Sequence, residues 1–303
     1  MLIEPKPGGG VRVLITGSTG QLGPYLLKEF SAQRYTIAAL SRMEHAPLFG
    51  VKTNSVDLGH SEAIREIFLS FRPNLVIHAA AMSRVHDAFS NPTKAFELNE
   101  KVTRNLARLC NDVNARLVYT STDMVFDGIS GSYHELCRPN PLSVYGKSKL
   151  AGEIAASEAR NSAVARLPLM FGPNLVTHMS QFEQIISSLR SNQVVQLFCD
   201  EWRSSCSFAT AARELRIVAE AEYKGVIHLG GGERVSRHDI GTAIARLLYV
   251  NENLVQKQLS AQTAHAEERP KDLSFDLANF RKTFPEFTIL SLHDDVRANI
   301  ALL

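Results

Sequence analysis

Residues 11–33 read VRVLITGSTGQLGPYLLKEFSAQ, a strand-like run that passes through a glycine-rich turn into a helical pattern. The β-branched residues of Val11–Thr16 predict a buried strand, and Gln21–Gln33 has helical periodicity. The glycines at 17, 20 and 23 follow a G-x-x-G-x-x-G spacing. In that spacing the first glycine permits a tight turn, the second lets the backbone approach a pyrophosphate, and the third allows the helix to pack closely on the strand. This context favours a dinucleotide-binding turn over a glycine turn without a ligand.

The start of the predicted helix adds unpaired N–H groups and the positive end of the helix dipole, both of which attract phosphate. The residues expected to hold a dinucleotide through this turn are Gly17, Ser18, Thr19, Gly20, Gln21, Leu22 and Gly23.

The alternation of strand and helix continues to about Pro168. Further strands are expected at Tyr35–Leu40, Val51–Val56, Leu75–Ala81, Arg116–Thr120 and Ala163–Leu167. Helices are expected at Ser61–Phe71, Asn91–Asn111 (capped by Asn91, with Pro92 at the first position) and Val144–Ala159. Strands and helices of this length predict an α/β fold, a Rossmann-type doubly wound parallel sheet with ligands at the carboxyl ends of its strands.

The pattern loosens after Pro168 and predicts a smaller C-terminal substrate-binding subdomain. We expect a mobile tail at residues 1–10, a nucleotide-binding domain at 11–168 and the substrate subdomain mainly at 169–303. Part of 205–232 is expected to return to the first domain.

Composition excludes several classes of protein. The chain has 303 residues with 33 Lys+Arg against 31 Asp+Glu, a formal charge of +2, which argues against a nucleic-acid binder. No apolar run reaches the ~20 residues of a membrane helix, and the first ten residues lack a signal-peptide pattern. The four cysteines are widely spaced without a C-x-x-C motif. We therefore expect a cytoplasmic protein with reduced cysteines and no metal site.

The ends of the next strands suggest which dinucleotide binds. Ser41-Arg42 ends the second strand, where an acidic residue is typical of NAD sites and an arginine accommodates the 2′-phosphate of NADP. We therefore expect NADP(H) as the preferred cofactor, with NAD(H) possible; Arg42 as an ordinary solvated charge is the alternative. The remaining cofactor contacts are expected from Asp57, Leu58, Ala79, Ala80, Ala81 and Asn99.

Tyr145 and Lys149 are four residues apart in a predicted helix and therefore lie on one face, ~6 Å apart at Cβ. A phenol with its ordinary pKa of ~10 is a poor acid–base group, and a nearby ammonium lowers that pKa. Thr122, at the end of the fifth strand, supplies a hydroxyl that can share a substrate oxygen with the phenol. Alone, the Tyr-x-x-x-Lys spacing also fits a surface pair; together with the glycine turn and Thr122 it favours a catalytic set. Lys149 and Tyr145 would also contact the nicotinamide ribose.

Several segments together resemble the extended short-chain dehydrogenase/reductase family, and within it the dTDP-4-dehydrorhamnose reductase group. They are TGSTGQLG (16–23), HAAA (78–81), STDMVFDG (121–128), PLSVYGKSKLAGE (141–153), HLGGGERVSR (228–237) and RPKDLSFD (269–276). The resemblance covers nearly the whole chain and implies NAD(P)H-dependent reduction of a 4-keto-6-deoxy nucleotide sugar, as in dTDP-rhamnose biosynthesis.

Carried over to this sequence, the resemblance makes Thr122 the group that orients the carbonyl, Tyr145 the proton donor and Lys149 the group that tunes Tyr145. Arg269 would face the diphosphate of the sugar nucleotide. The other expected substrate contacts are Met82, Ser83, Arg84, Asp123, Met124 and Phe126. A homodimer through the exposed faces of Asn91–Asn111 and Val144–Ala159 is expected by analogy.

The chain departs from the family pattern at several places, among them the following three. Met124 replaces the tyrosine that commonly follows the Ser-Thr-Asp triplet, and Met82-Ser83 replaces a Tyr-Thr pair after the alanines. Thioethers accept hydrogen bonds only weakly. These replacements therefore affect the identity of the substrate sugar more than the type of reaction. Tyr25 stands where some members carry a metal-binding glutamate, so no metal is expected there.

Two alternatives remain open. One is an epimerase or dehydratase of the same fold that keeps a tightly bound NAD; Arg42 argues against it, and no glutamate follows Asp123. The other is a non-catalytic NADP-binding regulatory subunit, resembling the beta subunit of methionine adenosyltransferase, which also lacks the Tyr-Thr pair.

Overall fold

The computed structural model of the protein describes residues 10–33, 35–176, 178–262 and 269–303. The expected mobile tail therefore lies, apart from Gly10, outside the described residues. The chain divides into two compact units. The first comprises residues up to 122 together with 143–166 and 212–227, and the second comprises 123–142, 167–211 and 228–303. Segment 123–142, which the sequence analysis leaves in the first domain, thus groups with the second unit.

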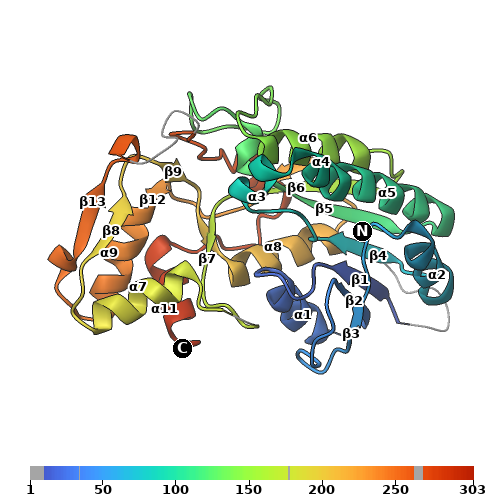
Figure 1. Ribbon diagram of the computed structural model, residues 1–303, viewed down its shortest axis with the longest axis horizontal. Coiled ribbons are helices and arrows are strands. Elements are labelled where there is room, and N and C mark those ends of the chain that lie inside the picture. Colours follow the sequence, from blue (N-terminus) through green and yellow to red (C-terminus); the bar gives the residue numbers. More distant parts are fainter. Residues whose placement is uncertain (1–9, 34, 177, 263–268) are drawn as a thin grey trace. The chain divides into compact units, whose positions relative to one another are not determined.

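A seven-stranded sheet forms the centre of the first unit, with the strand order β11-β6-β5-β4-β1-β2-β3 (Figure 1). Its strands are β1 (Arg12–Thr16), β2 (Thr36–Ser41), β3 (Thr53–Ser55), β4 (Leu75–His78), β5 (Arg116–Thr122), β6 (Ser162–Leu167) and β11 (Gly225–His228). The pairs β1–β2, β1–β4, β2–β3 and β4–β5 are parallel. This confirms the predicted Rossmann-type doubly wound sheet.

The strand order reverses between β1 and β4, which run on either side of the switch point where such sheets bind ligands. Thr16 at the end of β1 is in register with Leu40 of β2 and with His78 of β4. The ends of the three strands are thus aligned at one edge, and the loops that follow them start from a common level.

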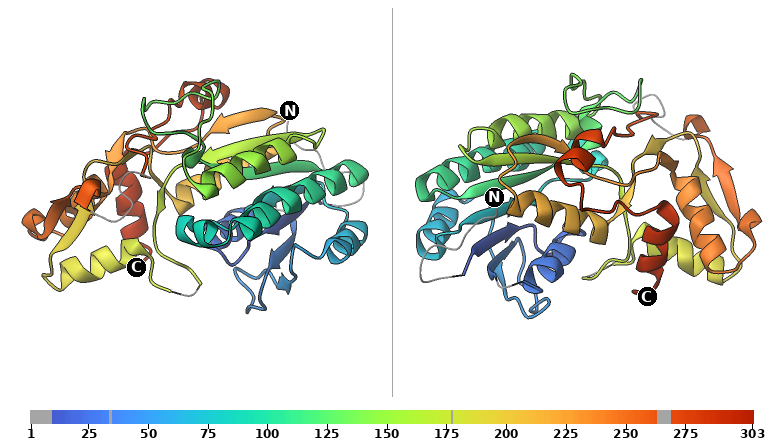
Figure 2. Two further views of the ribbon diagram at one scale, coloured as in Figure 1. Left: turned by 45° about the horizontal axis from the view of Figure 1, so that its top comes forward. Right: turned by 180° about the vertical axis from the view of Figure 1, so that it is seen from behind.

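Helices cover both faces of this sheet because each has one apolar stripe to bury. Phe68 of α2 (Ser61–Phe71), Leu106 of α5 (Val102–Val113) and Ala156 of α6 (Val144–Ala156) belong to one buried cluster with sheet residues. Helix α1 (Gly23–Ser31) and helix α8 (Phe208–Glu220) are joined by an ion pair between Arg216 Nε and Glu29 Oε1 at 2.8 Å. Figure 2 shows α5 and α6 side by side over the sheet.

The segment predicted as one helix over Asn91–Asn111 is interrupted. Asn91 caps its start, accepting a hydrogen bond from the Lys94 N–H at 3.0 Å, as predicted. The chain then forms α4 (Pro92–Phe96), a π-helical turn (Glu97–Lys101) and α5. A short helix, α3 (Val85–Ser90), precedes this segment and was not expected. A π-helical turn widens a helix locally and often marks a functional position.

The second unit has its own core between α7 (Gln181–Arg190), α9 (Arg237–Leu247) and α11 (Leu292–Ile300). Capping boxes at Ser180 and Ser236 fix the starts of α7 and α9. The described residues of this unit also form three strand pairs: β7 (Met170–Phe171) with β10 (Cys206–Ser207), β8 (Val195–Phe198) with β13 (Val255–Gln258), and β9 (Trp202–Arg203) with β12 (Val235–Ser236). They further include helix α10 (Ala278–Thr283) and 3-10 turns at Asp123–Val125, Glu252–Leu254 and Ser260–Gln262.

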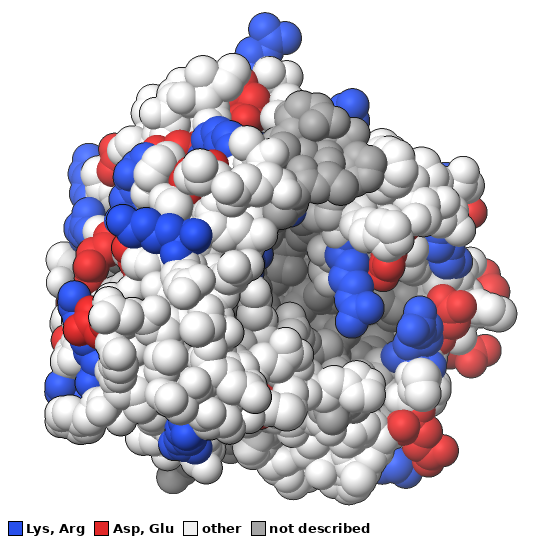
Figure 3. Space-filling view, turned by 60° about the vertical axis from the view of Figure 1, so that its left-hand side comes forward, with Lys and Arg blue, Asp and Glu red and all other residues white. Residues whose placement is uncertain are grey.

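Charges on the face drawn in Figure 3 are mixed, with Lys and Arg side chains beside Asp and Glu, in keeping with the net charge of +2. Among the described residues no helix is both long and apolar enough to span a membrane.

Candidate active site

The glycine-rich turn starts where β1 ends at Thr16. Gly17 has a positive φ of +70°, and a Cβ there would lie 2.7 Å from the backbone N of Ala80. A Cβ on Gly23 would lie 2.2 Å from the carbonyl oxygen of Gly17. Both positions therefore require glycine, the first for conformation and close approach, the second for contact between helix and turn. Gly20 is exposed, and the nearest atom to an added Cβ, the Gly17 oxygen, is 3.3 Å away.

The start of α1 suits an anion. Its N-cap, Leu22, makes no side-chain capping bond, so the first N–H groups of the helix are not satisfied by a cap. Ser18 is buried and donates its hydroxyl to the Leu40 carbonyl at 2.9 Å, which ties the turn to β2. Thr19 is half-buried and Gln21 is exposed. A glycine turn with no room for a Cβ at positions 17 and 23, leading into an uncapped helix start, fits the pyrophosphate of a dinucleotide.

The strand ends beside this turn carry the other expected cofactor residues. Ser41 is buried and donates its hydroxyl to the Met43 carbonyl at 2.5 Å, so its proton is already engaged, whereas Arg42 is exposed. Asp57 is exposed and accepts from the Gly59 N–H at 2.8 Å, beside a half-buried Leu58. The three alanines that follow β4, Ala79, Ala80 and Ala81, are half-buried.

A buried histidine links the glycine turn to the neighbouring helix. His78 is fully buried; its Nδ1 lies 2.7 Å from the Thr16 hydroxyl and its Nε2 lies 3.0 Å from the Thr103 hydroxyl. Thr103 donates to the Asn99 carbonyl, and Thr16 accepts the Ala80 N–H. The Thr103 hydroxyl proton is used on Asn99, so Thr103 accepts from His78 Nε2–H, and the Thr16 hydroxyl donates to Nδ1. His78 is therefore neutral, with its proton on Nε2. Burial, with a smaller contribution from the Lys149 charge, lowers the pKa of His78 to about 3.

Asn99, in the π-helical turn, connects the chain after β4 to the helix that carries Tyr145. Its buried amide accepts the Met82 N–H at 2.9 Å and donates to the Met82 carbonyl at 3.2 Å and to the Ser148 hydroxyl at 2.9 Å. Ser148 in turn donates to the Tyr145 carbonyl at 2.8 Å. Asn99 therefore holds the Met82 backbone and the first turns of α6 together.

The three expected catalytic residues lie in the first unit. Thr122 ends β5 and is buried, and Tyr145 is half-buried near the start of α6. Lys149 is buried, donates to the Thr120 carbonyl at 2.6 Å and has its ammonium 4.1 Å from the centre of the Tyr119 ring. Burial lowers the pKa of Lys149 to about 7, and the Glu153 charge opposes that shift. Lys149 is thus a buried amine, tied to the strand that carries Thr122, that gains and loses its proton near neutral pH.

A buried ion pair below this set was missed by the sequence analysis. Arg166 of β6 binds Glu153 of α6 through two bonds of 2.8 Å, Nε to Oε1 and Nη2 to Oε2. Glu153 also accepts the Ser121 hydroxyl at 2.5 Å. Glu153 was visible only as the end of the segment 141–153, and its partner thirteen residues later has no local signal.

The remaining expected residues divide between the units. Met82 is half-buried, and Ser83 and Arg84 are exposed, in the first unit. In the second unit, Asp123 is buried with its Oδ2 3.3 Å from Arg203 Nε, and Met124 is half-buried.

Phe126 packs in an aromatic group that fixes the segment after β5. Its ring stacks on Tyr133 at 4.1 Å and meets Phe275 and His228 edge-on. Phe126 is fully buried, so its role in the structure is to support the chain that carries Asp123 and Met124.

Arg269 belongs to a group of arginines in the second unit. Its guanidinium binds Glu201, with Nε to Oε1 at 2.5 Å and Nη2 to Oε2 at 3.1 Å. Arg203 and Arg237 are electrostatic neighbours, and Arg237 also feels Asp123, Glu201 and Arg269. Burial lowers the pKa of Arg237, and Glu201 opposes that shift. Of these, only Arg269 was expected from the sequence to contact a ligand; Arg237 stood only at the end of the segment 228–237 with no role assigned, and Arg203 lay outside every motif.

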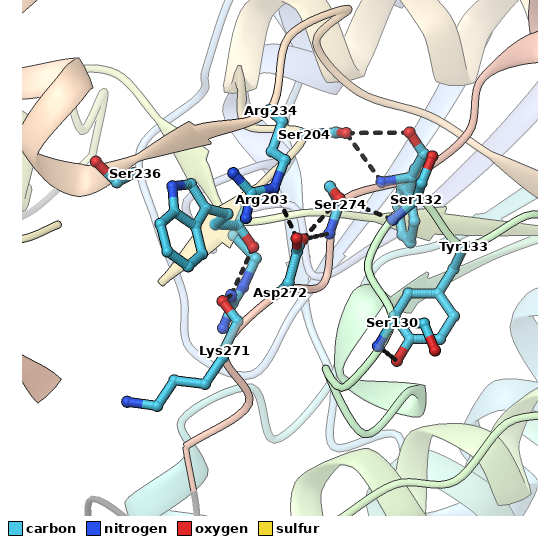
Figure 4. A network of polar contacts seen from close by, with 12 residues as sticks. Ser130, Ser132, Tyr133, Arg203, Ser204, Arg234, Ser236, Lys271, Asp272 and Ser274 are labelled. Carbon is cyan, nitrogen blue, oxygen red and sulfur yellow. Dashed lines mark hydrogen bonds and ion pairs between the residues drawn. The ribbon is translucent and has the colours of Figure 1, made fainter. Parts of the chain in front are cut away.

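The segment 269–276 is held by the polar network in Figure 4. Asp272 accepts from Arg234 Nε at 2.6 Å and from the Ser274 hydroxyl at 2.6 Å. Ser274 accepts the Ser132 N–H at 2.9 Å, and Arg234 lies over the Trp202 ring at 4.0 Å. Arg203 donates to the carbonyls of Trp202, Lys271 and Pro270. The backbone that follows Arg269, from Pro270 to Ser274, is thus held by several hydrogen bonds.

Within the described residues, no three His, Cys, Asp or Glu side chains gather as metal ligands would. The four cysteines are free thiols.

A sequence profile described as the RmlD substrate binding domain matches residues 11–299. The chain belongs to this family. This confirms the resemblance to the dTDP-4-dehydrorhamnose reductase group. The fold is shared with the dTDP-4-dehydrorhamnose reductase of Bacillus anthracis in complex with NADP (TM-score 0.86, 24% identity, 97% of this chain and 100% of that one).

Two proteins that are similar in sequence to this chain have different descriptions. Methionine adenosyltransferase 2 subunit beta of Bos taurus is 33% identical over 77% of this chain and 71% of its own length. A probable low-salt glycan biosynthesis reductase of Haloferax volcanii is 28% identical over 88% of this chain and 89% of its own. Membership in the RmlD family therefore indicates the fold. It does not decide between the two functions, because the relatives of this chain include one described as a probable reductase and one described as an enzyme subunit.

Proposed function

We propose that the protein is an NAD(P)H-dependent reductase of a 4-keto-6-deoxy nucleotide sugar. The observation that carries this proposal is the complete set of Thr122, Tyr145 and Lys149, with the lysine buried and bonded to the strand that ends at Thr122. A surface pair of Tyr and Lys would need neither burial nor an anchoring carbonyl, so this placement supports a chemical role.

The cofactor would be held by the turn from Gly17 to Gly23, by the alanines after β4 and by Arg42. When bound, NADPH supplies the hydride for the reduction. Arg42 is the exposed cation at the end of β2, and its charge is the reason to propose NADP(H) over NAD(H).

The protein's own residues manage the proton and the substrate. Thr122 donates a hydrogen bond to the keto oxygen, and Tyr145 delivers a proton to that oxygen as it becomes an alcohol. Lys149, whose pKa burial lowers to about 7, adjusts the phenol by its charge. Arg269 meets the anionic diphosphate.

One experiment tests the reaction. Purified protein is mixed with NADPH and dTDP-4-keto-6-deoxy sugars, and the absorbance of the reduced nicotinamide is followed. We expect stoichiometric oxidation that Tyr145→Phe abolishes and that Tyr249→Phe, at a tyrosine 96% exposed, leaves unchanged. Turnover without net consumption of NADPH would instead indicate an epimerase or dehydratase.

A second candidate is a regulatory subunit that binds the dinucleotide without turnover. The relatives described as methionine adenosyltransferase 2 subunit beta favour it, as do Met82 and Met124 at positions where reductases of the family carry hydroxyl groups. Tight NADPH binding without oxidation on any keto sugar, accompanied by a change in the activity of a methionine adenosyltransferase catalytic subunit, would support this candidate.

A further inference from the structure

Arg269 presents only part of its guanidinium to a ligand. Nε and one N–H of Nη2 are occupied by Glu201, and the flat face rests 4.6 Å from the centre of the Phe198 ring. In the described part of the chain Nη1 has no hydrogen-bond partner. The side chain of Arg269 is 35% exposed, while that of Glu201 is only 6% exposed. An anion can therefore reach Arg269 only on the edge away from a buried carboxylate.

Glu201 is held among cations that oppose its departure. Besides its two bonds to Arg269, it acts electrostatically on Arg237, which is itself close to Arg203. A buried carboxylate needs such counter-charges because its desolvation is costly. Moving Glu201 aside to free the whole guanidinium would leave a buried carboxylate without the cation that it contacts. We therefore expect the carboxylate to stay in place when an anion arrives.

The local charge count shows what this means for a ligand. The group around Arg237 contains three arginines, Arg203, Arg237 and Arg269, and two carboxylates, Asp123 and Glu201. It carries one net positive charge, whereas a diphosphate between a nucleoside and a sugar carries two negative charges. Removing the Glu201 charge alone would bring the group to two positive charges.

We propose that Glu201 is a specificity-determining residue that weakens the binding of diphosphates at Arg269 and reduces the advantage of a diphosphate over a monophosphate. This inference rests on the proposed function, since that function assigns the diphosphate to Arg269. It makes Glu201 the residue that sets how much anionic charge the site accepts.

Binding of dTDP, measured by calorimetry without turnover, tests the inference. Glu201→Gln keeps the size and one polar contact but removes the charge, and we expect it to bind dTDP about tenfold more tightly than wild type because like-charge repulsion is relieved. Asp200→Asn is the matched control. Asp200 also acts electrostatically on Arg269, but it forms its ion pair with Lys271 and its hydrogen bond with Ser260. We therefore expect Asp200→Asn to give a clearly smaller gain than Glu201→Gln.

A second measurement needs no variant. Wild type should prefer dTDP over dTMP by less than about tenfold, since the added phosphate charge meets Glu201. Equal or weaker dTDP binding by a folded Glu201→Gln, or an equal gain in Asp200→Asn, overturns the inference, as does a much larger wild-type preference for dTDP. Absence of dTDP binding by both wild type and Glu201→Gln overturns it too. A lack of NADPH oxidation would instead refute the proposed reduction and leave these binding results standing.

Discussion

His78 is fully buried and hydrogen-bonded through both ring nitrogens. Its contribution to the free energy of unfolding therefore depends on pH. Its pKa is about 3 in the folded chain and 6.5 as its ordinary value. Between these values the unfolded chain binds a proton that the folded chain does not. The stabilisation from this site is therefore fully present above pH 6.5 and is lost as the pH falls.

Replacing His78 should remove that acid dependence. For wild type we expect this site to cost about 1.4 kcal/mol of unfolding free energy between pH 7.5 and 5.5. In His78→Gln that contribution is absent, although the variant is less stable at both pH values because the bonds to Thr16 and Thr103 are disturbed. Urea unfolding at the two pH values measures the difference.

The control for that experiment is His86→Gln, at an exposed histidine. It should keep the wild-type difference between pH 7.5 and 5.5. A His78→Gln protein with the full wild-type acid dependence would show that another group is responsible.

Gly17 and Gly20 lie in the same turn but differ in how strictly they need to be glycine. Gly17 has a positive φ and no room for a Cβ, whereas a Cβ on Gly20 would meet a single atom. Gly17→Ala forces a Cβ into a positive φ and within 3 Å of the Ala80 backbone, so we expect a loss of roughly 2–4 kcal/mol in unfolding free energy. Gly20→Ala meets only the Gly17 oxygen at 3.3 Å and should cost less than about 1 kcal/mol. Chemical denaturation measures both; comparable losses would contradict this account of the turn.

At the scale of elements, the ion pair between Glu153 and Arg166 fastens α6 to β6. Both side chains are nearly excluded from solvent, so Glu153→Gln leaves a buried guanidinium without its counter-charge. We expect a loss of about 3–5 kcal/mol in unfolding free energy, measured by chemical denaturation. The double variant Glu153→Gln with Arg166→Met should recover part of that loss.

Another glutamate near the end of α6 provides the comparison. Glu158 pairs with Arg104 of α5 at 2.7 Å with both side chains partly in solvent, and Glu158→Gln should cost at most about 1 kcal/mol. Similar losses for Glu153→Gln and Glu158→Gln would show that burial does not determine the strength of the α6 anchorage.

The sequence predicts elements well where one face is apolar at a regular spacing. Helix α2 occurs over Ser61–Phe71 as predicted, because Ile64, Ile67, Phe68 and Phe71 share a face. The π-helical turn at Glu97–Lys101 was not predicted; it contains Asn99, which bonds to Met82 and Ser148. Such distant contacts leave no trace in local spacing.

The candidate site shows the same limit. Motifs locate the glycine turn, Thr122, Tyr145 and Lys149 because each has a fixed spacing. The partner of Arg269 is Glu201, 68 residues earlier in the chain. No sequence pattern joins them, so the charge actually available at Arg269 became visible only in the structure.

At the scale of the whole molecule, ligand binding should be visible as stability. A ligand that binds only the folded chain stabilises it by about 2.7 kcal/mol at a concentration of 100 times its Kd. We expect NADPH to raise the thermal unfolding midpoint progressively with concentration, and NADH to do so only at higher concentrations.

Two variants distinguish the contribution of Arg42 from that of the glycine turn to the shift in the unfolding midpoint. Arg42→Ala should bring the NADPH and NADH shifts close together, because the cation for the 2′-phosphate is gone. Gly17→Ala should show little shift with either dinucleotide. An NADPH shift that Gly17→Ala leaves intact would place the cofactor away from the glycine turn.

The chain passes from one unit to the other after residues 122, 142, 166, 211 and 227. During synthesis the sheet therefore cannot be completed when its first six strands have left the ribosome, because the strand that pairs with β6, β11, begins only at Gly225. Until β11 has been synthesised, the backbone N–H and C=O groups on that side of β6 have no strand to pair with. For the same reason neither unit can be exchanged by a single cut in the gene. A gene truncated near codon 168 encodes a sheet without its last strand, β11, and recombination at that point would also separate residues 123–142 from the rest of the second unit.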